Sequence, residues 1–183
     1  MTLFVERGYD AVTVADIAER ADLTKRSFFN HFADKREVVF AAADVLAQRV
    51  SSALAEADPD SDALDAAVWA YRRAATMLSD YPDMARARAA LIESSPELQE
   101  RNLMKMASMT AQVADALTAR GLSRREAMFV AHAATTVFST AVEAWFAAPG
   151  RGIASEIDDA LDDLRTALRS TARGSRRADP APG

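Results

Sequence analysis

Apolar residues recur at helical spacing along most of the chain. Val14, Ile17, Ala18 and Ala21, for example, follow the spacing i, i+3, i+4, i+7 of an amphipathic helix. Alanine is abundant, glycine and proline occur only six times each, and runs of β-branched residues are absent. The pattern predicts an all-α protein of about nine helices.

Capping residues and helix breakers divide the apolar pattern into segments. We expect helices over about 2–7, 13–21, 24–32, 34–57, 62–79, 84–93, 95–120, 123–148 and 155–172. The polar stretch 57–61 contains a proline and is the clearest linker. It suggests an N-terminal domain over residues 1–50 and a larger second domain over 51–173. Residues 174–183 lack apolar periodicity, and we expect them to form a disordered tail.

Composition narrows the classes of function. The formal net charge is −5, so any contact with nucleic acid must rest on a local basic patch. There is no cysteine, which excludes disulfides and thiolate chemistry. No apolar stretch approaches the ~20 residues of a membrane span, and the N-terminus lacks the pattern of a signal peptide. We therefore expect a soluble cytoplasmic protein.

Residues 13–35 carry the most informative pattern. Two short predicted helices are joined by a turn at Asp22, and the second opens with Lys25, Arg26 and Ser27 behind the N-cap Thr24. This is the layout of a helix-turn-helix, whose second helix enters the major groove of DNA. Residues in the first turn of such a helix reach the edges of the bases.

Cations gather around the second of these helices. Lys25, Arg26, Lys35 and Arg36 stand against a single acid, Asp34. Thr13 stands at the N-terminus of the preceding helix. It is a further candidate contact, because its hydroxyl and the free backbone N–H groups there can bind a phosphate. A solvated helix face is the alternative interpretation of these charges.

The stretch GYDAVTVADIAERADLTKRSFFNHFADKREVVF resembles the DNA-binding domain of TetR-type bacterial transcriptional regulators, and the resemblance covers about 3–46. It implies a homodimer whose two recognition helices enter successive major grooves of a palindromic DNA operator. It also implies a repressor that a small apolar or amphipathic effector releases from DNA. The expected DNA-binding residues are Thr13, Thr24, Lys25, Arg26, Ser27, Phe29, Asn30, His31 and Lys35.

Two features depart from the family pattern. Phe29 stands where the family usually has a phosphate-binding tyrosine, so that hydroxyl is lost here. The first predicted helix, 2–7, is shorter than the first helix of the family. We therefore expect the natural protein to begin upstream of Met1, and we expect weaker DNA binding from the chain as given.

The last two predicted helices carry apolar seams at heptad-like spacing. The resemblance implies that these helices form a four-helix interface between two copies of the chain. Packing within one chain is the alternative. The expected interface residues are Met128, Thr135, Phe138, Val142, Trp145, Ile157, Leu161, Leu164 and Leu168.

Methionines and aromatic residues between the linker and these seams suit an adaptable apolar pocket, although ordinary core is the alternative. The candidate effector-binding residues are Trp69, Met77, Leu91, Met106, Met109, Phe129 and His132. The segment 86–106 resembles the C-terminal domain of actinobacterial mycofactocin-system-type regulators. One such relative is associated with acyl-CoA ligands, which makes a fatty or acyl effector our expectation.

Three classes of function compete. An enzyme is the least favoured, because the chain has two histidines and lacks a phosphate loop, a nucleophile motif and a cluster of metal ligands. Accordingly, we expect no catalytic residues, no cofactor and no metal. A dimeric ligand-binding or protein-interaction module that does not bind DNA is the second class. A ligand-responsive, DNA-binding transcriptional regulator is the function that the sequence favours.

Overall fold

The computed structural model describes residues 1–148 and 150–176, with side chains described as far as residue 170. These residues form ten helices and no strand, which confirms the all-α prediction. The helices are α1 (Thr2–Arg7), α2 (Val14–Arg20), α3 (Lys25–His31), α4 (Lys35–Glu56), α5 (Ala63–Ala74), α6 (Thr76–Ser79), α7 (Pro82–Glu93), α8 (Pro96–Ala119), α9 (Arg124–Ala147) and α10 (Ile153–Arg176).

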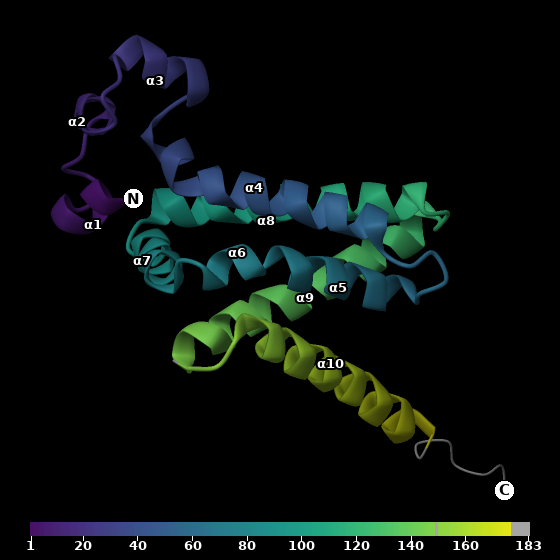
Figure 1. The fold of residues 1–183 in the computed structure, drawn as a ribbon. Coiled ribbons are helices and arrows are strands. Elements are labelled where there is room, and N and C mark those ends of the chain that lie inside the picture. Colours follow the sequence, from purple (N-terminus) through teal and green to yellow (C-terminus); the bar gives the residue numbers. More distant parts are fainter. Residues whose placement is uncertain (149, 177–183) are drawn as a thin grey trace, which may run out of the picture.

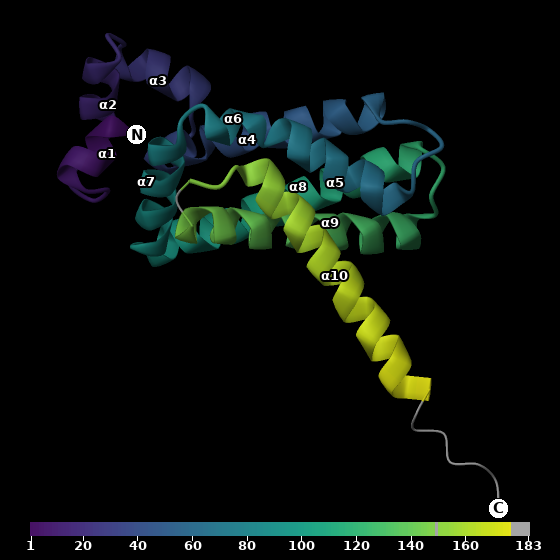
Figure 2. The ribbon, with the colours of Figure 1, turned by 60° about the horizontal axis from the view of Figure 1, so that its bottom comes forward.

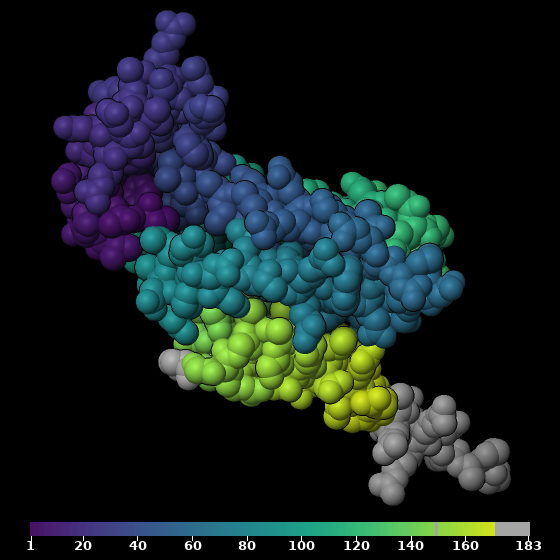
Figure 3. Space-filling model, in the orientation of Figure 1, coloured from purple at the N-terminus to yellow at the C-terminus, as the bar shows by residue number. Residues whose placement is uncertain are grey.

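The helices form a small head on the end of an elongated body (Figure 1). The head contains α1, α2 and α3, and the space-filling view shows it standing out from the body (Figure 3). Helix α4 leads from the head into the body, where it lies beside α8, while α9 packs against α5, α8 and α10. Helix α10 crosses α9 obliquely, and its C-terminal half projects beyond the other helices (Figure 2).

Two apolar clusters hold the fold together. The body cluster begins at Leu46 on α4 and includes Tyr71, Leu117 and Phe138, which belong to α5, α8 and α9. The smaller cluster joins head to body, and its members are Leu3, Phe4, Tyr9, Val12, Val39, Phe40, Leu91, Ile92 and Leu98. Helix α4 therefore contributes to both clusters. The expected boundary at residue 50 falls inside this continuous helix, and part of α7 and α8 packs with the head.

A half-buried cation joins α7 to α4 beside the smaller cluster. Arg88 on α7 donates from Nε to the carbonyl oxygen of Val39 at 2.8 Å, and its guanidinium lies 5.1 Å from the ring centroid of Phe40. Burial lowers the pKa of Arg88 to about 10. Among the residues that the structure describes, the partners of this charge are a backbone carbonyl and an aromatic face.

Capping residues explain most of the helix starts. Thr13, Thr24, Asp34, Asp62, Ser95 and Ser123 each accept backbone N–H groups at the N-terminus of a helix. Asp34 and Glu37 have the spacing of a capping box, but only the half made by Asp34 forms. The carboxylate of Glu37 bonds Arg101 and Lys105 on α8 instead of returning to the cap.

Three further expectations need correction. The segment 62–79 forms α5 and α6 in place of one helix, and at the junction the Thr76 hydroxyl donates to the carbonyl of Arg73 at 2.9 Å. Helix α10 runs to Arg176, so residues 174–176 are helical, and the rest of the expected tail lies outside the described residues. Helix α4 is also long and apolar enough to cross a membrane by length and composition alone. Its packing against α5 and α8 is typical of a core helix.

Candidate nucleic-acid interface

Helices α2 and α3 form the predicted helix-turn-helix. The turn between them depends on Asp22, whose φ of 55° lies in the left-handed region that aspartate adopts more readily than most residues. The backbone N–H of Leu23 closes the turn by donating to the carbonyl of Ala18 at 2.8 Å. The prediction of two short helices with a tight turn at 22–23 is confirmed.

Helix α3 is anchored by one aromatic ring. Phe28 is 2% exposed, and its ring centroid lies 5.4 Å from those of both Phe29 and Phe32. Phe29, in contrast, is 56% exposed. The inward ring fixes α3 on the head and leaves the opposite face of the helix open to a partner.

The exposed face of α3 carries the expected polar residues. Lys25, Arg26, Asn30 and His31 are exposed, and Ser27 is half-buried. Lys25 and Arg26 make no hydrogen bond or ion pair with any residue that the structure describes. Their charges are therefore available to an anionic partner.

The other two cations of the predicted patch are engaged elsewhere. Arg36 pairs with Asp34 and, at 3.1 Å, with Glu97 of α8. The ammonium of Lys35 donates to the carbonyl oxygens of Tyr9 at 3.0 Å and Val12 at 3.2 Å. The sequence placed four cations near α3, and the structure leaves two of them free there.

Hydroxyl groups expected to contact DNA also have partners inside the head. Thr13 and Asp16 form a capping box, and these hydrogen bonds hold the pKa of the Asp16 carboxyl below its ordinary value. A carboxylate thus occupies the N-terminus of α2, where a phosphate would be repelled. Thr24 caps α3, and its hydroxyl lies 2.9 Å from that of Ser27.

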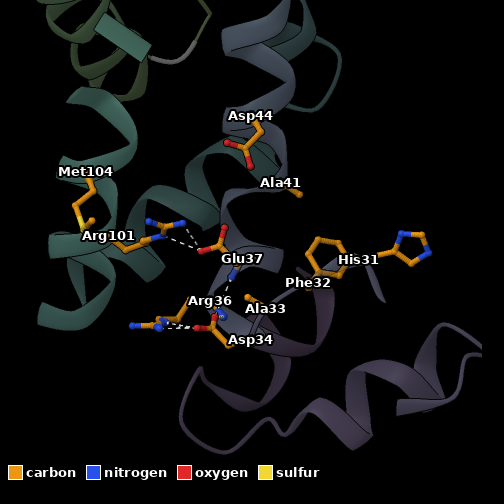
Figure 4. Close-up of a pocket in the computed structure, with 10 residues that line it drawn as sticks. All are labelled: His31, Phe32, Ala33, Asp34, Arg36, Glu37, Ala41, Asp44, Arg101 and Met104. Atoms are coloured by element: carbon orange, nitrogen blue, oxygen red, sulfur yellow. Dashed lines mark hydrogen bonds and ion pairs between the residues drawn. The ribbon is translucent and has the colours of Figure 1, made fainter. Parts of the chain in front are cut away.

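Ion pairs tie the start of α4 to α8 beside the head. Arg101 bonds Glu37 at 2.7 Å, and Lys105 lies 3.1 Å from Glu37 and 2.8 Å from Asp44. Figure 4 shows Arg101 reaching across from α8 to Glu37, at the edge of an open hollow of about 650 Å³. Sequence reasoning missed this joint because residues 37 and 101 are far apart along the chain.

The expected dimer residues are placed largely inside one protomer. Thr135, Phe138, Trp145 and Ile157 are buried in the body. A further four, Met128, Val142, Leu161 and Leu164, are half-buried against the same cluster, and Leu168 is 60% exposed. The seam on α9 is thus mainly intrachain core, which was the alternative interpretation. The exposed face of α9 carries Arg125, Phe129, His132, Thr136, Thr140 and Glu143.

The expected effector residues do not converge on one cavity. Trp69, Phe129 and His132 are exposed, whereas Leu91 belongs to the cluster that joins head and body. Only Met109 is fully within the body cluster, and Met77 and Met106 pack against it from the side. These residues thus lie in separate parts of the molecule. The methionine and aromatic pattern that suggested a pocket is equally typical of ordinary core.

A different polar group occupies the centre of the body. The hydroxyl of Tyr71 lies 2.8 Å from that of Thr135, which accepts from the Thr110 hydroxyl at 3.1 Å. The ring of Tyr71 stacks on Phe138 at 4.9 Å. Burial raises the pKa of Tyr71 to about 12. This group joins α5, α8 and α9, and its residue types gave no distinctive signal in the sequence.

Comparisons with known proteins agree with this geometry. Residues 1–42 match the family described as bacterial regulatory proteins, tetR family, and residues 59–169 match the MftR C-terminal domain. The second match covers more than half of the chain. The chain belongs to the TetR family of bacterial regulators and has a C-terminal domain of the MftR type.

Two individual proteins are similar to this chain. The HTH-type transcriptional regulator TcmR of Streptomyces glaucescens is 28% identical over 126 residues, which are 66% of this chain and 56% of TcmR. The chain therefore spans little more than half the length of this relative. The crystal structure of the TetR family regulator PfmR from Thermus thermophilus aligns with 90% of this chain and 93% of its own, at 22% identity and a TM-score of 0.48. A TM-score this low supports no inference.

Proposed function

We propose that the protein is a ligand-responsive transcriptional regulator that binds a double-stranded DNA operator through α3 and has no catalytic role. The observation that carries the proposal is the open face of α3, on which Lys25 and Arg26 are exposed and unpaired. Cations at the first turn of a recognition helix contact phosphates and base edges in the major groove. Binding to DNA implies that the protein acts in the cytoplasm.

The open face of α3 is suited to DNA by its shape as well as its charge. Phe28 holds the inner side of the helix, while Asn30 and His31 extend the polar surface to its C-terminal end. The protein has a formal net charge of −5, so its overall electrostatic field would not attract DNA. The contact must be local, and α3 presents two free cations, Lys25 and Arg26.

Selection of duplex DNA from a random-sequence library tests this proposal. We expect the wild-type chain to enrich a palindromic sequence, and we expect Lys25→Ala to enrich the same sequence more weakly because a phosphate contact is lost. A suitable control is Arg124→Ala, since Arg124 pairs with Asp115 at the far end of α8 and α9. Failure to enrich any sequence at low salt would favour the alternative module that does not bind DNA.

We further propose that two copies associate through the exposed face of α9. Helices α5, α8 and α10 cover the other sides of α9, so Phe129, His132 and Thr136 are left facing outward. Phe129 is 65% exposed, and aromatic residues are enriched at protein–protein interfaces. The membership of the chain in a family of dimeric regulators supports this arrangement.

Sedimentation equilibrium of a charged variant tests the α9 contact. We expect Phe129→Glu to shift the protein from dimer to monomer, because a carboxylate would be desolvated at the contact. A matched control is Leu103→Glu on α8, whose residue is 70% exposed and lies outside the proposed contact. If both variants remained dimeric, the proposed α9 contact would be wrong and the dimer would use another surface.

The effector is proposed to be a fatty or acyl compound, on the strength of the MftR-type C-terminal domain. The protein would act as a repressor, and the bound effector would release it from the operator. Calorimetry with a long-chain acyl-CoA, followed by a DNA-binding assay with and without it, tests the idea. We expect heat on binding and weaker association with the operator. Absence of both would remove this class of ligand.

A further inference from the structure

The ammonium of Lys35 lies at the base of the helix-turn-helix. Lys35 is the first residue of α4, and its Nζ donates to the carbonyl oxygens of Tyr9 at 3.0 Å and Val12 at 3.2 Å. The same atom is 4.3 Å from the centroid of the Tyr9 ring. Three interactions therefore fix one cation to the short segment between α1 and α2.

The bonds from Lys35 connect the segment before α2 to the segment after α3. Val12 immediately precedes Thr13, the N-cap of α2, and Lys35 follows Asp34, the N-cap of α4. The chain leaves this point, forms α2 and α3, and returns to it. The bonds from Lys35 therefore join the two ends of the unit that presents α3.

The surroundings leave this unit few other supports. Helices α2 and α3 pack mainly against each other, neither belongs to the body cluster, and Ile17 of α2 packs against the smaller cluster. Tyr9 and Val12 are 5% and 1% exposed, so the carbonyls that Lys35 holds belong to well-anchored residues. A charge-assisted hydrogen bond is about twice as strong as a neutral one. Lys35 is thus placed to set the angle of α3 relative to α4.

We infer that Lys35 is a positioning residue that holds the recognition helix in place, and that it does not neutralise a DNA phosphate. The inference rests on the proposed DNA-binding function, because its purpose is the presentation of α3. It replaces the phosphate contact expected for Lys35 from the sequence. The free cations Lys25 and Arg26 remain the residues of α3 that neutralise phosphates.

A pair of matched variants separates positioning from phosphate contact. Lys35→Met keeps the aliphatic stem and removes the charge at the base of the head. Lys25→Met does the same on the exposed face of α3. Both variants are made in the full chain and compared with wild type at a temperature where all three are folded.

The first measurement is amide hydrogen exchange without DNA. We expect exchange in residues 14–31 to rise on the order of tenfold in Lys35→Met, the scale of one lost hydrogen bond to a charged group. Exchange in α9 is the internal control and stays unchanged, as does exchange everywhere in Lys25→Met. Unchanged exchange of 14–31 in Lys35→Met would overturn the inference.

The second measurement is the salt dependence of binding to the duplex that wild type selects from the library. Loss of one phosphate contact per protomer flattens the slope of log K against log salt by about 2 for a dimer. We expect this flattening in Lys25→Met. In Lys35→Met we expect the wild-type slope, with affinity reduced about tenfold at every salt concentration.

A flattened slope in Lys35→Met would overturn the inference whatever the exchange rates are. If wild type selects no DNA, the proposed function fails, and the exchange measurement decides the role of Lys35 alone. Faster exchange confined to 14–31 then supports the positioning role.

Discussion

The head and the body are held together in different ways. In the body, α9 packs against three other helices, and large side chains such as Tyr71, Leu54 and Leu117 are completely buried. In the head, α2 and α3 depend on Phe28 and on a few polar bonds at their base. The proposed DNA-binding surface is therefore supported by far fewer contacts than the domain that carries it. Small local changes should therefore affect recognition without affecting the body.

The largest expected effect comes from removing one buried side chain in each region. Leu117→Ala should lower the free energy of unfolding of the body by about 2–5 kcal/mol, because it leaves a cavity among tightly packed helices. Phe28→Ala should cost the head about 3–5 kcal/mol and unfold it locally, with loss of DNA binding. Thermal unfolding followed by circular dichroism, with DNA binding measured in parallel, checks both.

Separate unfolding of head and body is contradicted if Phe28→Ala lowers the temperature of the main unfolding transition as much as Leu117→Ala does. Head and body would then unfold as one cooperative unit. Loss of DNA binding with an unchanged main transition is the expected result.

The alkaline stability of the body should depend on Tyr71. Its pKa is raised in the folded protein to about 12, from 10. Because the folded pKa is the higher one, the contribution of the protonated phenol is complete below pH 10 and is lost as the pH rises to 12. A shift of this size corresponds to roughly 2–3 kcal/mol. In urea titrations, Tyr71→Phe should lose less stability than wild type between pH 10 and 12, and equal losses would contradict the burial of this hydroxyl.

The ion pairs between α4 and α8 should contribute less. Glu37→Gln weakens the bonds to Arg101 and Lys105, whose side chains are 29% and 14% exposed. We expect a loss of about 1–2 kcal/mol in the free energy of unfolding, since hydrogen bonds to charged groups are partly shielded here from water. Arg124→Gln, which breaks an exposed pair with Asp115, is the control and should change stability by less than about 0.5 kcal/mol. If both variants changed the free energy of unfolding equally, the ion pairs of Glu37 would contribute no more than ordinary surface pairs.

The smallest effect is expected at the turn of the helix-turn-helix. Asp22 adopts a φ of 55°, and Asp22→Gly should stabilise the head by roughly 0.5–1 kcal/mol because glycine enters this region without steric cost. Slower amide exchange in α2 and α3 is the measurement. Faster exchange would show that the aspartate side chain supports the turn.

The sequence was sufficient to predict the elements of the head. Thr13, Thr24 and Asp34 mark the starts of α2, α3 and α4, because N-caps act through bonds only two or three residues away. The helix-turn-helix pattern also assigned Lys25 and Arg26 to the first turn of α3, where both are exposed.

Interactions between distant residues were beyond this reasoning. Lys35 and Arg36 look alike in the sequence, yet the first bonds the carbonyls of Tyr9 and Val12 and the second bonds Glu97. On α9, an apolar seam has the same spacing whether it faces a second copy or its own chain. The structure turns Phe138 and Trp145 inward and leaves Phe129 outside.

The salt dependence of operator binding tests the central claim most directly, namely that α3 presents two free cations from each protomer to DNA. Four neutralised phosphates in the dimer predict a slope of log K against log salt of about −4. A slope of about −7 would contradict the account, because Lys35 and Arg36 would then also neutralise phosphates. Absence of binding at low salt would contradict the proposed function itself.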